Sequence, residues 1–271
     1  MNDETHDDIP ARDWHGRTID AAYCGDCVYS PMRSDAGDVG DAGCRPGRSC
    51  LHDVYARRID RFFRHHPQLA NAHLSEPYFE LRAIAARNAD VFRLAPLMAD
   101  EDETVRLQVA LRVPQRLLQR MVNDPHREVR IRVAQRLPSD TLMSMVRDED
   151  YQVRLIVARR APEGLLALLM HDVDLQVREA VAQRLPMPAL WRMAADTAPE
   201  VRRIVAQGHE LASHGYGHER ASDLSPEAFL DDIRRAKRIL EDLPGVQVHG
   251  YRAPSFSIGH GNLWAFDCLR E

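Results

Sequence analysis

A pair of residues, Val-Arg, recurs in the middle of this chain at a constant step of 24 residues. The step holds for five copies, and aspartate, alanine and proline columns recur in phase with it. Self-similarity at a fixed period of this length is the mark of repeat architectures, in which neighbouring units seal one another's apolar faces. The columns are Val105-Arg106, Val129-Arg130, Val153-Arg154, Val177-Arg178 and Val201-Arg202; Asp100, Asp124, Asp148, Asp172 and Asp196; Ala110, Ala134, Ala158, Ala182 and Ala206; and Pro114, Pro138, Pro162 and Pro186.

Each copy predicts one helix followed by a second, shorter one. Val133, Ala134 and Leu137 follow Val129 on one face of a helix of period 3.6, and Pro138 ends that helix because proline has no amide proton to continue it. A second apolar set with i, i+3, i+4 spacing follows at Leu142, Met145 and Val146. Twenty-four residues cannot hold two full helices and two turns, so we expect the second helix to be brief and partly 3₁₀.

The array extends upstream in weaker form. Leu81-Arg82, with Ala86, is in phase with the strong copies, and residues 53–67 read as a more degraded copy. One repeat buries too few apolar side chains to offset the entropy of ordering it, so the flanking segments are expected to cap the array. The fold class predicted is all-α, a solenoid with an N-terminal cap and a short C-terminal α/β fragment.

The recurring arginines have a functional and a structural interpretation. They could form a basic ladder for an anionic partner, or they could pair with the in-phase aspartates and cap neighbouring helices. Between Val91 and Gln207 there are 18 Arg against 16 Asp plus Glu, and the whole chain has a net charge of −5. A nucleic-acid footprint needs uncompensated positive charge, so the structural interpretation is favoured and a nucleic-acid partner is not expected.

Four cysteines precede the repeats, at Cys24, Cys27, Cys44 and Cys50, in a segment rich in glycine and proline. The spacing C-x2-C-x16-C-x5-C suits a tetrahedral metal or an iron–sulfur cluster. Disulfides and unliganded structural cysteines are the alternatives. The acidic N-terminus shows no signal-peptide core, and the longest apolar run, Leu165 to Met170, is far too short to cross a bilayer. A cytoplasmic chain with reduced thiols, no membrane contact and a metal or cluster is therefore expected, although the spacing does not decide between zinc and iron–sulfur.

Together these features resemble the leucine-rich repeat variant family. The resemblance rests on Cys24-Gly-Asp-Cys27, Gly43-Cys44-Arg-Pro-Gly-Arg-Ser-Cys50 and the pattern V-R-x-x-V-A-x-R-x-P, and it covers about residues 15–207. It implies a [4Fe–4S] cluster in which each of the four cysteines ligates one iron. It also implies a right-handed solenoid of alternating α- and 3₁₀-helices. The function it favours is a binding scaffold for a protein partner, with a structural, redox-responsive or iron-responsive cluster.

The pattern ends at Gln207, and a different composition follows. His214 and His218 are four residues apart between glycines, in a loop expected at the end of a strand, and Ser225-Pro226-Glu227 predicts the start of a helix that runs to about Asp242. Residues 208–271 resemble the polysaccharide deacetylase family. That resemblance implies that His214 and His218 are metal ligands, with zinc the common ion, and that Arg252 and Pro254 match a later motif.

The deacetylase motifs that precede and follow these residues are not found in the sequence. An Asp-Asp pair is expected upstream of His214, where the repeats lie, and a late histidine is expected beyond Glu271. Two histidines without a base cannot run the hydrolysis, so no deacetylase activity is expected, and carbohydrate is a partner only for a complete barrel.

The sequence therefore predicts three domains, 1–52, 53–207 and 208–271, of which the last carries Cys268 as a buried or free thiol. The alternatives are a metal-dependent polysaccharide N-deacetylase, catalytically incomplete here, and a zinc-stabilised nucleic-acid binder. The seam at 207/208 is consistent with a gene fusion, a rearranged locus or an assembly error.

Overall fold

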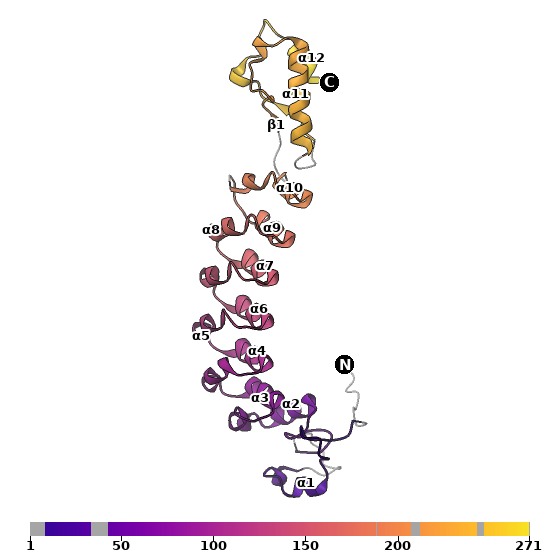
Figure 1. The fold of residues 1–271 in the computed structure, drawn as a ribbon, viewed down its shortest axis with the longest axis vertical. Coiled ribbons are helices and arrows are strands. Elements are labelled where there is room, and N and C mark those ends of the chain that lie inside the picture. The colour runs from indigo at the N-terminus through magenta and orange to yellow at the C-terminus, as the bar shows by residue number, and fades with distance from the viewer. Residues whose placement is uncertain (1–8, 34–42, 188, 207–211, 243–246, 271) are drawn as a thin grey trace. The chain divides into compact units, whose positions relative to one another are not determined.

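The computed structural model describes residues 9–33, 43–187, 189–206, 212–242 and 247–270. The chain divides into two compact units, Met1–Pro138 and Ser139–Glu271. Figure 1 labels the helices of both units. The described residues are mostly helical, with few in strands. No described helix is both long and apolar enough to traverse a bilayer.

In the first unit, a cysteine-bearing segment is followed by α-helices that alternate with 3₁₀-helices. Helices α2, α3 and α4 pack on one another in order, and α4 packs on α6. The elements are α1 (Ala21–Gly25), η1 (Ser30–Met32), α2 (Ala56–His65), η2 (Pro67–His73), α3 (Phe79–Asn88), η3 (Val91–Arg93), η4 (Ala95–Ala99), α4 (Glu103–Arg112), α5 (Gln115–Leu118), η5 (Gln119–Met121) and α6 (Arg127–Arg136).

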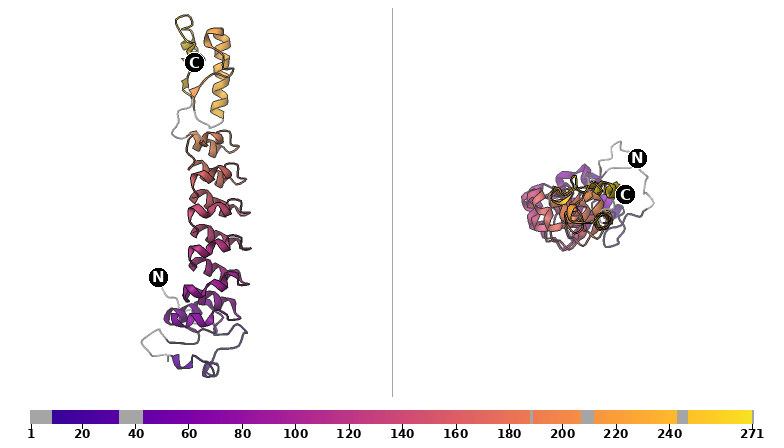
Figure 2. Two further views of the ribbon diagram at one scale, coloured as in Figure 1. Left: turned by 90° about the vertical axis from the view of Figure 1, so that its left-hand side faces the viewer. Right: turned by 90° about the horizontal axis from the view of Figure 1, so that it is seen from above.

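The second unit opens with the same alternation. Helix α7 packs on α9, and α9 packs on α10 (Figure 2). The elements are η6 (Ser139–Met145), α7 (Tyr151–Arg160), α8 (Glu163–Leu166), η7 (Ala167–Leu169), α9 (Leu175–Ala182), η8 (Ala189–Met193) and α10 (Pro199–Ala206). The expected brief, partly 3₁₀ second helix of each copy is thus confirmed. Helices α2 and α3 confirm that the two weak upstream copies are helical.

The repeat columns form the core and the helix caps. Val105, Val109 and Ala110 are fully buried in α4, as are the in-phase Val129, Val133 and Ala134 in α6. Among the described helices, α4, α7 and α9 begin at an aspartate whose carboxylate accepts from the backbone two residues on. Asp102 accepts from the N–H of Thr104 at 2.8 Å, and Asp150 does the same for Gln152 at 2.9 Å. Such caps satisfy amide protons that the first turn leaves unpaired.

The arginines of the Val-Arg column form ion pairs and hydrogen bonds within the fold. Arg106 donates from Nε and Nη2 to both carboxylate oxygens of Asp124, at 2.8 and 3.1 Å, while its Nη1 donates to the Asp100 carbonyl. Each such arginine therefore ties the turn before its own helix to the aspartate of the next repeat. We call these Arg–Asp pairs the rungs; within the two units they are Arg82–Asp100, Arg106–Asp124, Arg154–Asp172 and Arg178–Asp196.

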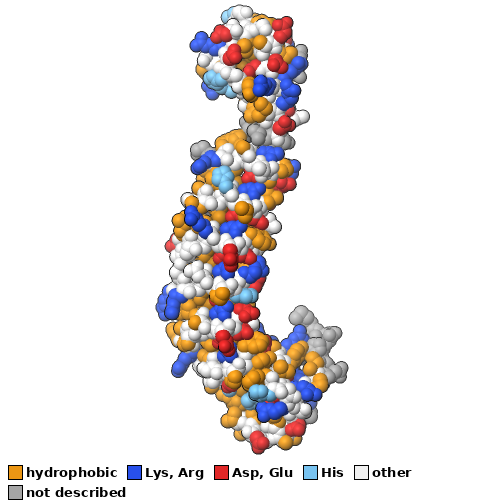
Figure 3. Space-filling view, in the orientation of Figure 1, with side chains coloured by type: hydrophobic (Ala, Val, Ile, Leu, Met, Phe, Trp, Pro, Cys, Tyr) orange, Lys and Arg blue, Asp and Glu red, His pale blue; other side chains and the backbone are white. Residues whose placement is uncertain are grey.

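A second arginine column caps the ends of helices. Arg112 Nη1 donates to the carbonyls of Ala86 and Ala89, both at 2.6 Å, and Arg136 Nη1 donates to the Ala110 carbonyl. Arg184 does the same for Ala158 and Ala161. Both columns confirm the structural interpretation of the arginines, and on the face in Figure 3 basic and acidic side chains are interleaved over the repeats.

Residues 212–270 have a small core of their own. Strand β1 (Ala212–Ser213) pairs in parallel with β2 (Gly250–Tyr251), and η9 (Ala221–Asp223), α11 (Pro226–Asp242), η10 (Pro254–Phe256) and α12 (Ala265–Arg270) complete the described elements. Helix α11 starts and ends where the sequence predicts, and the hydroxyl of Ser225 accepts from the N–H of Ala228. The core of this C-terminal region consists of Ala221, Phe229, Ile233 and Ala265.

Candidate functional site: a four-cysteine pocket

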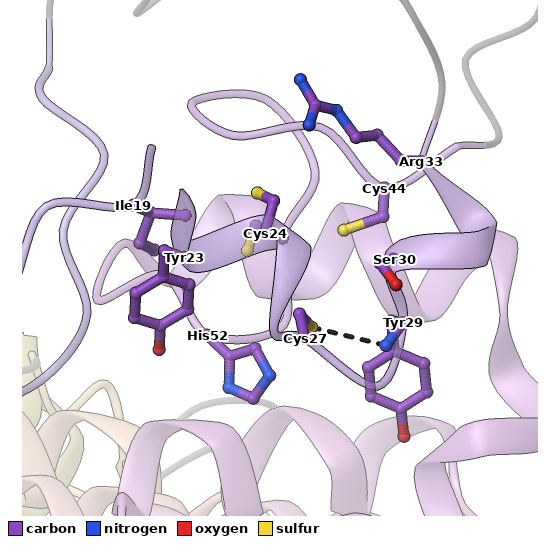
Figure 4. Close-up of a pocket in the computed structure, with 10 residues that line it drawn as sticks. Ile19, Tyr23, Cys24, Cys27, Tyr29, Ser30, Arg33, Cys44 and His52 are labelled. Carbon is purple, nitrogen blue, oxygen red and sulfur yellow. Dashed lines mark hydrogen bonds between the residues drawn. The ribbon is translucent and has the colours of Figure 1, made fainter. Parts of the chain in front are cut away.

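The four N-terminal cysteines come from two separate stretches of chain and line one pocket. Cys24 lies in α1 and Cys27 follows it, whereas Cys44 and Cys50 flank a tight turn farther along. Cys24, Cys44 and Cys50 are buried, and Cys27 is half-buried. Figure 4 shows Cys24, Cys27 and Cys44 on different sides of the same space. The structure therefore brings together all four residues that the sequence singled out.

A turn between Arg45 and Ser49 carries Cys44 and Cys50 to the same pocket. The Arg45 and Ser49 backbones form an antiparallel bridge, and Gly47 at the tip has a φ of +77°, which favours glycine. The backbone N–H of Cys44 donates to the Met32 carbonyl at 2.8 Å, which holds this turn beside the stretch that bears the first two cysteines. The positive φ at the tip of the turn thus explains why the motif Cys44-Arg-Pro-Gly-Arg-Ser-Cys50 has glycine at position 47.

Backbone amides approach the sulfur atoms. The N–H of Tyr29 donates to Cys27 Sγ at 3.4 Å, drawn as the dashed line in Figure 4. The backbone of His52, two residues after Cys50, likewise acts to lower the pKa of the Cys50 thiol. Such bonds stabilise negative charge on a sulfur ligand.

The pocket disfavours four bare thiolates. Burial raises the pKa of Cys24, with a further rise from the charge on Cys50. The hydrogen bond between Cys50 and Cys44 raises the pKa of Cys50, as does burial, and the same bond lowers the pKa of Cys44. Burial together with the neighbouring Cys27 raises the pKa of Tyr29. A positively charged group bound among the sulfurs would relieve this cost, which fits a metal-containing occupant.

The sequence analysis named none of the other residues that line the pocket, three of which bear directly on the sulfurs. Tyr29 and His52 each stand two residues after a cysteine, a spacing that could have pointed to them, and Arg33 brings a positive charge beside Cys24 and Cys44. The space between these side chains, including the part open to solvent, is about 290 Å³.

A buried ion pair between Arg58 and Asp53 fixes the cysteine-bearing segment to helix α2. Arg58 of α2 donates from Nη1 to Asp53 at 3.0 Å and from Nη2 to the Ile9 carbonyl at 2.7 Å, and both charged side chains are almost fully buried. The backbone N–H of Cys50 donates to the Arg58 carbonyl at 3.2 Å. One of the cysteines is therefore bonded directly to the first helix of the repeat region.

The two tail histidines lie together in a loop after β1. Their rings meet edge to face with centroids 4.8 Å apart, and His214 Nδ1 donates to the Arg252 carbonyl at 2.6 Å. A hydrogen bond from one ring nitrogen to a carbonyl is the usual way a metal-binding histidine is oriented. Among the described residues, however, no third His, Cys, Asp or Glu stands with this pair in a position to complete a metal site.

The loop that carries these histidines is held by a carboxylate of α11. Asp232 accepts from the backbone N–H groups of Tyr216 and Gly217, at 3.0 and 2.7 Å. Gly215 has a φ of +84°, and a Cβ there would lie 2.7 Å from Asp232 Oδ2, so only glycine fits. The two matched motif residues, Arg252 and Pro254, follow the end of β2. Pro254 is buried. Cys268 is half-buried, with its thiol 3.7 Å from the Pro226 carbonyl.

The fold and the pocket define a class of protein, a helical-repeat protein with a four-cysteine segment. A family model described as "LRV protein FeS4 cluster" matches residues 11–72, and "Leucine rich repeat variant" matches residues 151–174. A solved structure described as "a leucine-rich repeat variant with a novel repetitive protein structural motif" has a TM-score of 0.62 and 35% identity, over 91% of this chain and 97% of that one. The chain belongs to the leucine-rich repeat variant family.

Two further matches cover only part of the chain. A "Polysaccharide deacetylase" model matches residues 188–263, and so includes η8 and α10 as well as the tail. The "Uncharacterized 27.7 kDa protein in nifB 3'region" of Rhodobacter capsulatus is 47% identical over 103 residues, which is 38% of this chain and 38% of that protein. The expected domain borders at 52/53 and 207/208 stay predictions.

Proposed function

We propose that this chain is a [4Fe–4S]-binding helical-repeat scaffold. Cys24, Cys27, Cys44 and Cys50 each ligate one iron, and the repeats form a right-handed solenoid whose surface binds a protein partner in the cytoplasm, where thiols stay reduced. The observation that carries the proposal is the convergence of four thiols from two stretches of chain on one largely buried pocket.

A cluster is proposed in preference to zinc because the family model described as "LRV protein FeS4 cluster" matches residues 11–72, which include all four cysteines. All four line the pocket, although among the described residues no three such side chains are gathered as closely as a single metal ion requires.

When bound, such a cluster supplies one-electron redox chemistry. The chain's own contribution is to exclude water by burying three of the cysteines, to donate the Tyr29 amide to Cys27, and to place Arg33 near Cys24 and Cys44. The amide and the guanidinium lower the cost of negative charge on the sulfurs.

The scaffold part of the proposal rests on how the charges are used. The arginines of the rungs pair with aspartates, and the helix-capping arginines bond to backbone carbonyls, so neither set offers uncompensated positive charge to a nucleic acid. Large apolar side chains stand exposed on both units, among them Phe92 on the first and Leu168 and Val173 on the second. Exposed apolar groups of this kind are common in protein–protein contacts.

The cluster is proposed to stabilise the first repeats and thereby to report redox or iron status. Its ligand Cys50 bonds to the backbone of α2, on which α3 packs, so loss of the cluster is expected to loosen both helices. Chemical unfolding of the anaerobic chain with and without its cluster tests this. A lower midpoint without the cluster is expected, and identical midpoints would refute the sensing role.

The deacetylase-like tail is proposed to be catalytically incomplete in this chain. His214 and His218 keep the geometry of two ligands, but an acid–base residue and a third ligand are needed for metal-assisted hydrolysis. Incubation with an N-acetylglucosamine oligomer and zinc, followed by an assay for acetate, is expected to show none. Acetate release that the substitution H214A abolishes would establish the enzyme instead.

A further inference from the structure

One buried histidine outside the family model's iron–sulfur region links that region to the repeats. His73, at the end of η2, has only 8% of its surface exposed. Its Nε2 lies 2.6 Å from the Tyr29 hydroxyl, and its Nδ1 lies 2.7 Å from Glu76 Oε1. Tyr29 is the residue whose backbone N–H donates to Cys27 Sγ.

The register of the repeats explains why Glu76 is available to this histidine. Glu76 stands 24 residues before Asp100, so it holds the acidic position of the rungs, and Arg58 stands 24 residues before Arg82. Arg58 donates to Asp53, beside the cysteine segment, while Glu76 accepts from His73. At the first step of the array, the arginine and the acidic residue that correspond to a rung therefore contact other residues, which link them to the cysteine segment: Arg58 bonds to Asp53, and Glu76 bonds to His73.

The hydrogen bonds fix how the imidazole is used. A carboxylate can only accept, so Nδ1 carries the proton that is donated to Glu76, and in the neutral imidazole Nε2 accepts from the Tyr29 hydroxyl. The Tyr29 ring is also flanked by Phe62 and His73, with ring centroids 5.5 and 5.7 Å away. Tyr29 is thus held at its hydroxyl end by the repeats and at its amide end by Cys27.

We propose that His73 is a positioning residue that couples the first repeat to the cluster. By holding the Tyr29 side chain, it keeps the Tyr29 amide aimed at Cys27 Sγ and so raises the reduction potential of the cluster. Hydrogen bonds to a ligand sulfur favour the reduced state, which carries one more negative charge. This inference rests on the proposed cluster ligation by Cys27.

Because coupling is reciprocal, the same contact should transmit in both directions. The state of the cluster biases the hydrogen bonds of His73 and Glu76, and Glu76 is bonded in turn to α3, since Arg82 donates to the Glu76 carbonyl at 2.8 Å. The path from Cys27 to α3 is therefore a continuous series of contacts through Tyr29, His73 and Glu76.

The test is redox titration of the anaerobically purified full chain and four variants, after the iron and sulfide content of each has been measured. We expect Y29F, which loses only the hydroxyl, and H73M to lower the midpoint potential, while H73Q, which still donates and accepts, stays closer to the parent chain. The matched control is H65M, because His65 is exposed at the end of α2.

Two outcomes are kept apart by this design. If the parent chain holds no iron and sulfide, the proposed function fails and this inference falls with it. If the parent chain is loaded but Y29F and H73M share its potential and its low-temperature electron paramagnetic resonance spectrum, the coupling role of His73 is refuted alone. Should H73M fail to fold, Y29F decides the matter, because it removes one hydroxyl from an otherwise unchanged ring.

Discussion

The cysteine pocket and the histidine pair both have the spacing of metal motifs in the sequence, but they differ as structures. The cysteines come from two stretches, three of them are buried, and all four line one pocket. The histidines come from one loop, both are exposed, and among the described residues no third ligand joins them. The spacing of ligand residues in the sequence suggests a metal site, whereas the convergence and burial of their side chains determine whether that site can bind a metal or a cluster.

The sharpest way to break this comparison is to remove a ligand from each region. C44S or C50S is expected to abolish the visible absorption and nearly all bound iron, because each substitution removes one of the four thiolates that hold the proposed cluster. C268S, in the tail, is the matched control and should keep the full iron content. A C50S chain that still holds its full complement of iron would contradict the assignment.

A second prediction concerns the rungs, where buried charge is fully paired. Asp124 and Arg106 are both buried, so D124A strands a guanidinium without its carboxylate. We expect a loss of about 3–5 kcal/mol in the free energy of unfolding. D140A, at an exposed aspartate of η6, should change that free energy by less than about 0.5 kcal/mol. Urea unfolding of the three chains measures both, and equal losses would show that the rungs lie on the surface in solution.

The rungs also predict a dependence of stability on pH. Burial tends to raise the pKa of Asp172, but its hydrogen bonds with Arg154 and the Asp174 backbone outweigh this and leave the pKa below its ordinary value. The stabilisation is therefore fully present above the unfolded pKa of about 3.9 and is lost as the pH falls through the lower folded pKa.

Unfolding midpoints measured between pH 5 and pH 2 test this prediction. The parent chain should lose stability over the acid part of the range, and R154M should lose less because Asp172 no longer accepts hydrogen bonds from the Arg154 guanidinium, which favour its charged form. R159M is the control, since Arg159 is exposed on the same helix. A flat profile for the parent chain would contradict the lowered pKa of Asp172.

The smallest effect is expected at the tail. H214A removes one hydrogen bond, to the Arg252 carbonyl, and should cost about 1 kcal/mol in the free energy of unfolding. Because two exposed histidines hold zinc only weakly, added zinc should shift the thermal midpoint of the parent chain and of H214A equally. A zinc-dependent rise seen in the parent chain alone would show that the tail completes a metal site.

Much of this organisation could be predicted because it is local or periodic. Val105 and Arg106 repeat at a fixed step, so their burial and pairing follow from the pattern, and Pro226 after Ser225 marks the start of α11. The Tyr29–His73 contact spans 44 residues and belongs to no column, so only the folded chain shows it. The hydrogen bond from His214 to the Arg252 carbonyl is hidden in the same way, since it depends on the pairing of β1 with β2.

The most direct test of the central claim is the content of iron, acid-labile sulfide and zinc per chain in protein purified without oxygen, together with its visible spectrum. The account predicts about four irons and four sulfides, with a broad absorption band near ~400 nm. Zinc bound without sulfide would contradict it and would make the four cysteines a structural clip.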